Sequence, residues 1–195
     1  MSDYYNQNAK VFYESTVDID MSPLYERFLP LLSGKRILDA GCGSGRDSKA
    51  FEILGYDVTA FDSSSALVNL ARSNASRVHY MSFADMDWTE EFDGVWACAS
   101  LLHLPYRELS KVLARIAEAL KSEGVLYCSF KYGDTERVKD GRFFADLNER
   151  LFLQFIDGVP ALDLLSIWVS DDQRSNRDER WLNCLCRKRV FTSTD

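Results

Sequence analysis

The segment from Arg36 to Ser48 limits the possible folds of this chain more than any other feature. It opens with the strand-like run RILDA, continues through the glycine-rich stretch GCGSG, and ends in RDS at the start of an amphipathic segment. This order is typical of a buried strand, a tight turn and the first turn of a helix, which together begin an open α/β sheet. Glycines in such a turn adopt positive φ angles and let a ligand approach the backbone closely. We therefore expect an α/β protein that binds a ligand at this turn.

Short β-rich runs alternate with amphipathic segments along the rest of the chain. Strands are expected at residues 36–40, 57–61, 78–82, 94–98, 125–131, 164–169 and 182–186. Helical spacing of apolar residues predicts helices at 47–54, 66–74, 106–120 and 143–155. This alternation predicts a doubly wound, mostly parallel seven-stranded sheet with helices on both faces.

Residues 1–34 precede the sheet and contain two further helix candidates, at 4–15 and 23–32. The second has Ser22 as its expected N-cap and Pro23 in its first turn. With 195 residues and 46% hydrophobic content, the chain has material for one core of ordinary size. We expect one domain over residues 1–195, in which residues 1–34 form a helical cap and residues 35–195 form the core.

Composition disfavours several classes of protein. No run approaches the roughly 18 apolar residues that cross a bilayer, and the N-terminus lacks the apolar segment of a signal peptide, so we expect a cytoplasmic protein without membrane contact. The five cysteines lie in apolar segments without a CxxC pair, which predicts reduced thiols and no metal site. A net charge of -7 without a basic block makes nucleic acid an unfavourable partner. The oligomeric state is left open.

A carboxylate follows the glycine turn by about 20 residues, at the end of the second expected strand. This residue, Asp62, is placed to accept hydrogen bonds from both hydroxyls of a ribose, or else to cap the helix that begins at 63–65. Arg46 occupies the position where a dinucleotide-binding G-x-G-x-x-G fingerprint has its third glycine. The pattern favours a nucleoside cofactor other than a dinucleotide.

These residues resemble class I S-adenosylmethionine (SAM)-dependent methyltransferases, whose first motif is similar to ILDAGCGSG and whose second strand ends in an acid. The Gly-x-Gly-x-Gly-Arg-x-Ser form of residues 41–48 resembles the small tellurite-resistance-type subgroup most. The resemblance extends over nearly the whole chain. It implies the Rossmann-like methyltransferase fold with a C-terminal antiparallel strand, SAM as the cofactor, and methyl transfer as the activity.

The resemblance also implies roles for residues around the turn. Asp39 is expected near the amino group of the cofactor's methionine part, and Arg46 is expected at its carboxylate, which a guanidinium matches with two donors. Asp62 and Ser63 are expected at the ribose. The remaining contacts to the methionine part are expected from Gly41, Cys42, Gly43 and Gly45.

The third strand departs from the family pattern. Where the family commonly offers an acid and a small residue to the adenine, this chain has Met81-Ser82-Phe83. Either Ser82 can hydrogen bond to the purine and Phe83 can pack on it, or Asp85 or Asp87 takes the place of the missing acid.

The segment after the fourth strand and the N-terminal tyrosines complete the expected cofactor site. Cys98 and Ala99 are expected to face the reacting sulfonium. Tyr4, Tyr5 and Tyr13 resemble tyrosines that close over the cofactor, where their ring faces favour a cation. The alternative is that each tyrosine only packs in the core.

Candidate catalytic residues follow the fourth and fifth strands. His103 has an ordinary pKa of about 6.5, which suits a general base, although a structural role is equally open. Lys131 and Tyr132 end the fifth strand, ahead of a polar loop that forms either a lid for an anionic substrate or a solvated hairpin. The further cations of that loop are Arg137, Lys139 and Arg142.

Three functions remain in competition. The first is a methyltransferase that acts on a small molecule, either anionic or chalcogen-containing. The second is a SAM-binding regulatory or complex partner without turnover of its own. The third is a tRNA-modifying methyltransferase, which requires the cations at 131–142 and 174–180 to converge in the fold.

Overall fold

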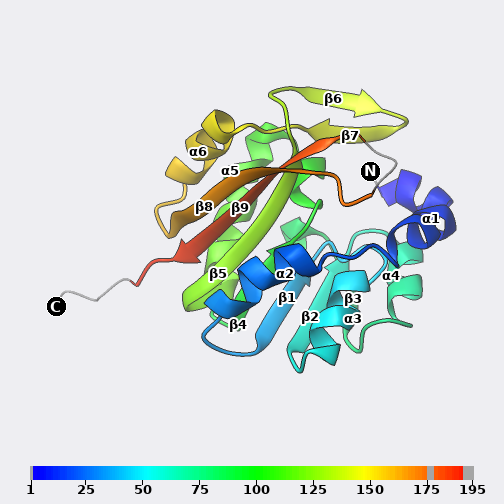
Figure 1. Ribbon diagram of the computed structural model, residues 1–195, viewed down its shortest axis with the longest axis horizontal. Helices are drawn as coiled ribbons and strands as arrows, with labels where there is room; N and C mark the ends of the chain where they lie inside the picture. The colour runs from blue at the N-terminus through cyan, green and yellow to red at the C-terminus, as the bar shows by residue number, and fades with distance from the viewer. Residues whose placement is uncertain (1, 175–177, 191–195) are drawn as a thin grey trace.

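The computed structural model describes residues 2–174 and 178–190, and its centre is a seven-stranded sheet (Figure 1). Along the sheet the strand order is β3-β2-β1-β4-β5-β9-β8. The bounds are β1 Arg36–Ala40, β2 Asp57–Asp62, β3 Val78–Tyr80, β4 Phe92–Ala97, β5 Leu120–Lys131, β8 Leu162–Asp171 and β9 Arg180–Lys188. All seven expected strands are present, with shifted ends.

Strand direction agrees with the expected architecture. The pairs β1–β2, β1–β4, β2–β3 and β4–β5 are parallel, whereas β9 runs antiparallel to both β5 and β8. The order turns at β1, since β2 lies on one side of it and β4 on the other. In such sheets the crevice at the carboxyl ends of the strands beside this switch point is the usual place for a ligand.

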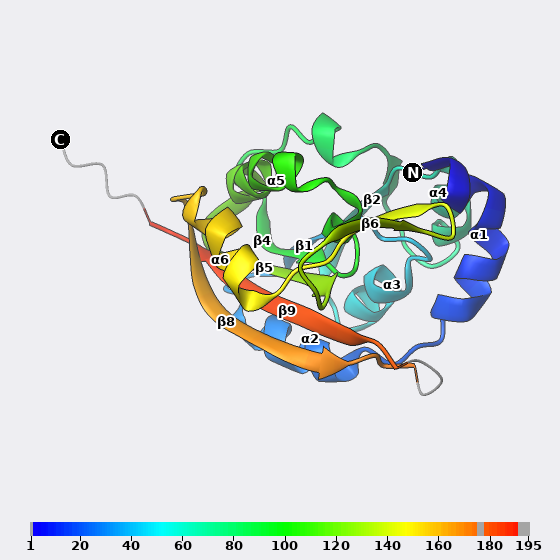
Figure 2. The same ribbon diagram turned by 90° about the horizontal axis from the view of Figure 1, so that it is seen from above.

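Helices cover both faces of the sheet (Figure 2). Their bounds are α2 Ser22–Phe28, α3 Arg46–Ile53, α4 Ser65–Ala71, α5 Tyr106–Ala119 and α6 Glu149–Asp157. One apolar cluster joins α5 and α6 to the face that carries Leu38 and Leu126, and a second joins α2 and α3 to the face that carries Ile37 and Tyr127. No helix in the described ranges combines the length and the apolar character needed to cross a membrane.

The N-terminal helices lie in two different places. Helix α1 (Ser2–Thr16) packs against α4, where the Asn6 amide oxygen accepts a hydrogen bond from the Ser64 hydroxyl at 2.7 Å. Helix α2 instead lies on the sheet face, with Phe28 fully buried against Trp96. The expectation that Ser22 caps α2 is wrong: Met21 is the N-cap, and Ser22 is already helical, so its hydroxyl is not at the capping position.

A hairpin over residues 136–145 replaces part of an expected helix. Strands β6 (Glu136–Lys139) and β7 (Arg142–Ala145) pair antiparallel, and α6 begins only at Glu149. The helix expected from residue 143 is therefore wrong over its first turns. The turn residues Asp140 and Gly141 have φ angles of 52° and 74°, which suit a two-residue hairpin turn. The segment is therefore a regular hairpin, and a role for its cations as a lid over an anion stays a prediction.

Candidate active site

A cavity of about 180 Å³ lies at the carboxyl ends of β1, β4 and β5, and residues of α1 and of β7 in the hairpin also line it. It lies at the switch point of the sheet, as the topology predicts. Several of the expected site residues line it together: Tyr5, Gly41, Cys42, Gly43, Arg46, Cys98, Ala99, His103 and Lys131. Other expected residues lie outside its lining: Tyr13, Asp39, Gly45, Asp62, Ser63, Ser82, Phe83 and Tyr132.

The glycine turn is tied to the end of β2 through Asp62. Gly43 has a φ of 53°, and its N–H donates to Asp62 Oδ2 at 3.0 Å. Asp62 Oδ1 accepts from the Ser64 N–H at 2.8 Å, while the Ser64 side chain is the N-cap of α4. Burial raises the pKa of Asp62, against the effect of its backbone donors. Each carboxylate oxygen keeps a lone pair for a further donor, as a ribose would require.

Gly45 and Ser63 belong to the segments around this turn but do not line the cavity. Gly45, with a φ of 74°, is the N-cap of α3, where an added Cβ would lie 3.1 Å from Ala71. Ser63 is exposed beside Asp62. Glycine is therefore required at 45 by helix packing and by the backbone conformation.

Asp39 lies behind the turn and is buried. Its Oδ2 accepts a hydrogen bond from the Ser48 hydroxyl at 2.5 Å. Burial raises the pKa of Asp39, and the neighbouring charge of Asp47 raises it further. In this position the carboxyl group connects the end of β1 to the first turn of α3 and supports the loop from below.

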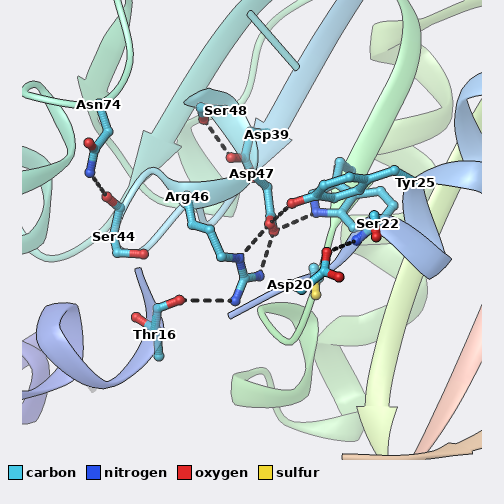
Figure 3. A network of polar contacts seen from close by, with 12 residues as sticks. Thr16, Asp20, Ser22, Tyr25, Asp39, Ser44, Arg46, Asp47, Ser48 and Asn74 are labelled. Carbon is cyan, nitrogen blue, oxygen red and sulfur yellow. Dashed lines mark hydrogen bonds and ion pairs between the residues drawn. The ribbon is translucent and has the colours of Figure 1, made fainter. Parts of the chain in front are cut away.

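A second buried carboxylate, Asp47, organises the floor of the cavity (Figure 3). It accepts hydrogen bonds from Arg46 Nε at 2.6 Å and Nη2 at 2.9 Å, from the Tyr25 hydroxyl at 2.5 Å, and from Trp96 Nε1 at 2.8 Å. Burial alone would raise the pKa of Asp47, but the Arg46 charge and these donors lower it. This network is not visible in the sequence, because Tyr25 and Trp96 reach Asp47 only through tertiary packing.

The ion pair with Asp47 limits the number of Arg46 N–H groups that can bind a ligand. Two of its nitrogens are occupied by Asp47, and Nη1 faces the Thr16 carbonyl oxygen at 3.4 Å. The guanidinium nevertheless lines the cavity, so its free N–H groups remain available to a cofactor carboxylate.

Helix α1 covers the glycine turn. A Cβ added at Gly43 would lie 3.1 Å from the Phe12 ring, and the Tyr5 phenol is close enough to Asp62 to sense its charge. Tyr13 is directed elsewhere, since its hydroxyl accepts from Asn74 Nδ2 at 2.8 Å. Phe12 was missed in sequence because its contact with Gly43 joins distant segments.

The residues expected to contact the adenine form hydrogen bonds and ring contacts within the protein. Ser82 and Asp85 form a capping box around the short turn Phe83–Asp85, with the Ser82 hydroxyl 2.6 Å from Asp85 Oδ2. Phe83 packs edge-on against Phe61 with ring centroids 5.1 Å apart. A purine contact therefore requires the exposed edge of this segment and not the Ser82–Asp85 pair itself.

The reacting end of the cavity is formed where β4 ends. Ala99 has a φ of 50°, and its N–H donates to the Ser129 hydroxyl on β5 at 2.9 Å. Burial raises the pKa of the Cys98 thiol to about 12, so Cys98 is neutral and not a nucleophile near pH 7. Ser129 also lines the cavity and was missed, although a serine within the apolar run of β5 is a visible signal.

His103 is held in one tautomer. Its Nδ1 lies 2.8 Å from the Phe143 carbonyl oxygen, which only accepts, so Nδ1 carries the proton. Nε2 is then the acceptor for the Tyr5 hydroxyl at 2.7 Å. Burial lowers the pKa of His103 to about 4, and the charges of Arg142 and Lys131 act in the same direction. The histidine is therefore a neutral base whose lone pair faces α1 and the cavity.

Lys131 and Tyr132 point to different surroundings, as successive strand residues do. Lys131 lines the cavity, pairs with Glu179 at 2.6 Å, and lies over the Phe144 ring at 5.0 Å. Tyr132 donates to Glu149 at 3.0 Å outside the cavity lining. The geometry brings Lys131 to the site together with His103, but not Tyr132.

Sequence comparison connects this site with known proteins. Residues 37–124 match the model of the family described as "Methyltransferase domain". The "Ubiquinone biosynthesis O-methyltransferase" of Xanthomonas oryzae pv. oryzae (strain PXO99A) is 35% identical over 106 residues, which cover 50% of this chain and 44% of that protein. The chain thus spans less than half the length of this curated relative.

Structural comparison identifies the fold of the chain. The 1,6-didemethyltoxoflavin-N1-methyltransferase of Burkholderia thailandensis, solved with 1,6-didemethyltoxoflavin and S-adenosylhomocysteine (SAH), has a TM-score of 0.81 and 21% identity, covering 97% of this chain and 87% of that one. The cyclase SpnF has a TM-score of 0.65 and 19% identity, covering 87% of this chain and 80% of that one. The chain has the Rossmann-like methyltransferase fold.

Proposed function

We propose that this protein is a SAM-dependent methyltransferase whose methyl acceptor is a small molecule. The observation that carries the proposal is one continuous cavity in which the glycine turn meets His103 and Lys131. The domain match and the relatives named for methyl transfer in ubiquinone biosynthesis and onto 1,6-didemethyltoxoflavin support it.

The residues of the turn fit SAM. Gly41 and Gly43 hold positive φ angles that keep the backbone open, and both line the cavity. Asp62 would hold the ribose through the lone pairs that its two backbone donors leave free. Arg46 would bind the carboxylate of the methionine part through its remaining N–H groups. Bound SAM supplies an electrophilic methyl group on a sulfonium.

The protein's own contribution is alignment, exclusion of water and proton transfer. Tyr5 and Phe12 close the cavity from α1. His103 Nε2 would accept the proton that the acceptor's nucleophilic atom loses when it is methylated. The low pKa of His103 limits its strength as a base, so it serves an acceptor whose proton is itself acidic.

Between an anionic and a chalcogen-containing acceptor, the cavity favours the anion, since Arg142 lines it without a carboxylate partner among the described residues. The tRNA alternative has less support. Among the described cations of 131–142 and 174–180, Lys131, Arg142 and Arg174 line the cavity. Lys131 and Arg174 are each paired with a carboxylate, which leaves little of the unpaired positive surface that a phosphate backbone requires. No observation favours the alternative in which the protein binds SAM as a regulatory or complex partner without turnover of its own.

Calorimetry with SAM and SAH tests the cofactor assignment. Asp62→Ala is expected to weaken binding by at least about tenfold, because the ribose loses two charge-assisted hydrogen bonds. Asp163→Ala removes an exposed carboxylate that pairs only with surface Arg189 and serves as the control. Unchanged affinity in Asp62→Ala would refute the ribose assignment.

Methyl-labelled SAM incubated with the protein and a fractionated cell extract tests the acceptor class. We expect label in small metabolites. Label in RNA would favour the tRNA alternative, and SAM binding without any transfer of label would favour the partner without turnover.

A further inference from the structure

The positively charged side chains that line the cavity differ in whether they form an ion pair with a carboxylate. Among the described residues, Arg142 alone of the four cations in the lining lacks a carboxylate within ion-pair distance, and its Nε is buried without a hydrogen-bond partner. The compensated pairs are Arg46 with Asp47, Lys131 with Glu179, and Arg174 with Asp172, each at 2.6 Å. A desolvated donor without a partner is rare in proteins and is expected where a ligand completes the site.

The Arg142 guanidinium is held between aromatic rings. Its Cζ lies 5.0 Å from the Tyr4 ring centroid and 5.2 Å from that of Phe144. It also lowers the pKa of the neighbouring Tyr5 phenol, against the larger effect of burial. Rings fix the orientation of the planar group without neutralising it, so its charge remains available for an anion.

The same short strand carries the contacts that orient the candidate base. Phe143 accepts the Nδ1 proton of His103, and the Phe144 ring centroid lies 5.2 Å from the imidazole. Tyr5, Phe144 and Trp181 line the cavity around these groups, so its walls at this end are aromatic. An anion at Arg142 would thus lie beside the same Phe144 ring that contacts His103, within aromatic walls.

From this arrangement we propose that the methyl acceptor is a small aromatic carboxylic acid. Its carboxylate pairs with Arg142, and its nucleophilic hydroxyl replaces the Tyr5 phenol at His103 Nε2. Arginine suits the two oxygens of a carboxylate because its donors form a planar fork. The proposal rests on the proposed function, since it names the acceptor class of the same site.

The test separates the acceptor site from the cofactor site. Benzoate and its neutral analogue benzamide are titrated into the full chain, with and without saturating SAH, and binding is followed by ligand-observed NMR. The variants are Arg142→Gln and the matched control Arg107→Gln, which removes the same charge from a side chain that is 82% exposed. Calorimetry with SAH on each variant checks folding and the cofactor site together.

We expect wild-type protein to bind benzoate at least about tenfold more tightly than benzamide, Arg142→Gln to lose this preference, and Arg107→Gln to keep it. Equal binding of the two probes to the wild type would overturn the proposal. So would a tenfold loss of SAH affinity in Arg142→Gln, because Arg142 would then bind the cofactor's own carboxylate. Failure of the wild type to bind SAH would count against the proposed function, while the titrations without SAH would still decide the Arg142 site.

Discussion

Protonation of His103 is expected to destabilise the fold as the pH falls, and His103→Gln should remove this dependence. In the folded protein the imidazole is enclosed by Tyr5 and the β6–β7 hairpin, and Nδ1 donates to the Phe143 carbonyl. Burial lowers its pKa from the ordinary 6.5 to about 4, with Arg142 and Lys131 adding to the effect. A proton on Nε2 would place a charge among cations and away from water.

The size of the effect follows from linkage. The unfolded chain takes up the proton near its ordinary pKa, whereas the folded chain does so only near pH 4, so the stabilisation is complete above about pH 6.5 and is lost as the pH falls toward 4. At about 1.4 kcal/mol per pKa unit, the whole loss is about 3 kcal/mol. Between about pH 7.5 and about pH 5 it is about 2 kcal/mol.

Urea unfolding at these two pH values measures the loss. The free energy of unfolding of the wild type should fall by about 2 kcal/mol more than that of His103→Gln, and carboxyl groups cancel in the difference. His79→Gln is the matched control, because this second histidine is exposed on β3 and its loss should leave the pH dependence nearly that of the wild type.

Imidazole ¹⁵N NMR gives an independent reading, since the chain has only two histidines. His103 should appear as the neutral Nδ1–H form down to about pH 5. Equal pH dependence of stability in the wild type and His103→Gln, or titration of the His103 resonance near its ordinary pKa, would refute the reasoning.

Two further predictions concern the loop and the floor of the cavity. Gly43→Val should abolish SAM binding in calorimetry while circular dichroism stays native, because a side chain at a φ of 53° would lie against Phe12 in cofactor space; retained affinity would contradict the loop assignment. Trp96→Phe should lower the free energy of unfolding by at least about 2 kcal/mol in urea, because it removes the 2.8 Å indole hydrogen bond to buried Asp47 and leaves a cavity; a loss below about 1 kcal/mol would show that Asp47 is compensated in another way.

Local pattern was sufficient to predict the sheet and the glycine turn. The apolar run of residues 36–40 is a local signal for a strand, and the positive φ angles of the turn after Ala40 favour glycine whatever the turn packs against. A hairpin was one of two alternatives for the polar segment after β5, but its second strand was assigned to the next helix although Asp140-Gly141 is a recognised hairpin turn signal. Phe143 and Phe144 were assigned to the next helix, because two adjacent apolar residues are compatible with both the helical and the strand hydrophobic repeat when the apolar segment is short.

The sequence by itself determined the fold class, the position of the cofactor turn and the presence of Asp62 at the next strand end. Only the tertiary structure decided which charges are compensated. Asp47 pairs with two nitrogens of Arg46, Glu179 pairs with Lys131, and Arg142 has no carboxylate partner in the part of the chain that the structure describes. The reason is physical: backbone period and glycine φ are local properties, whereas desolvation, tautomer and charge pairing depend on groups that only folding brings within a few ångströms of one another.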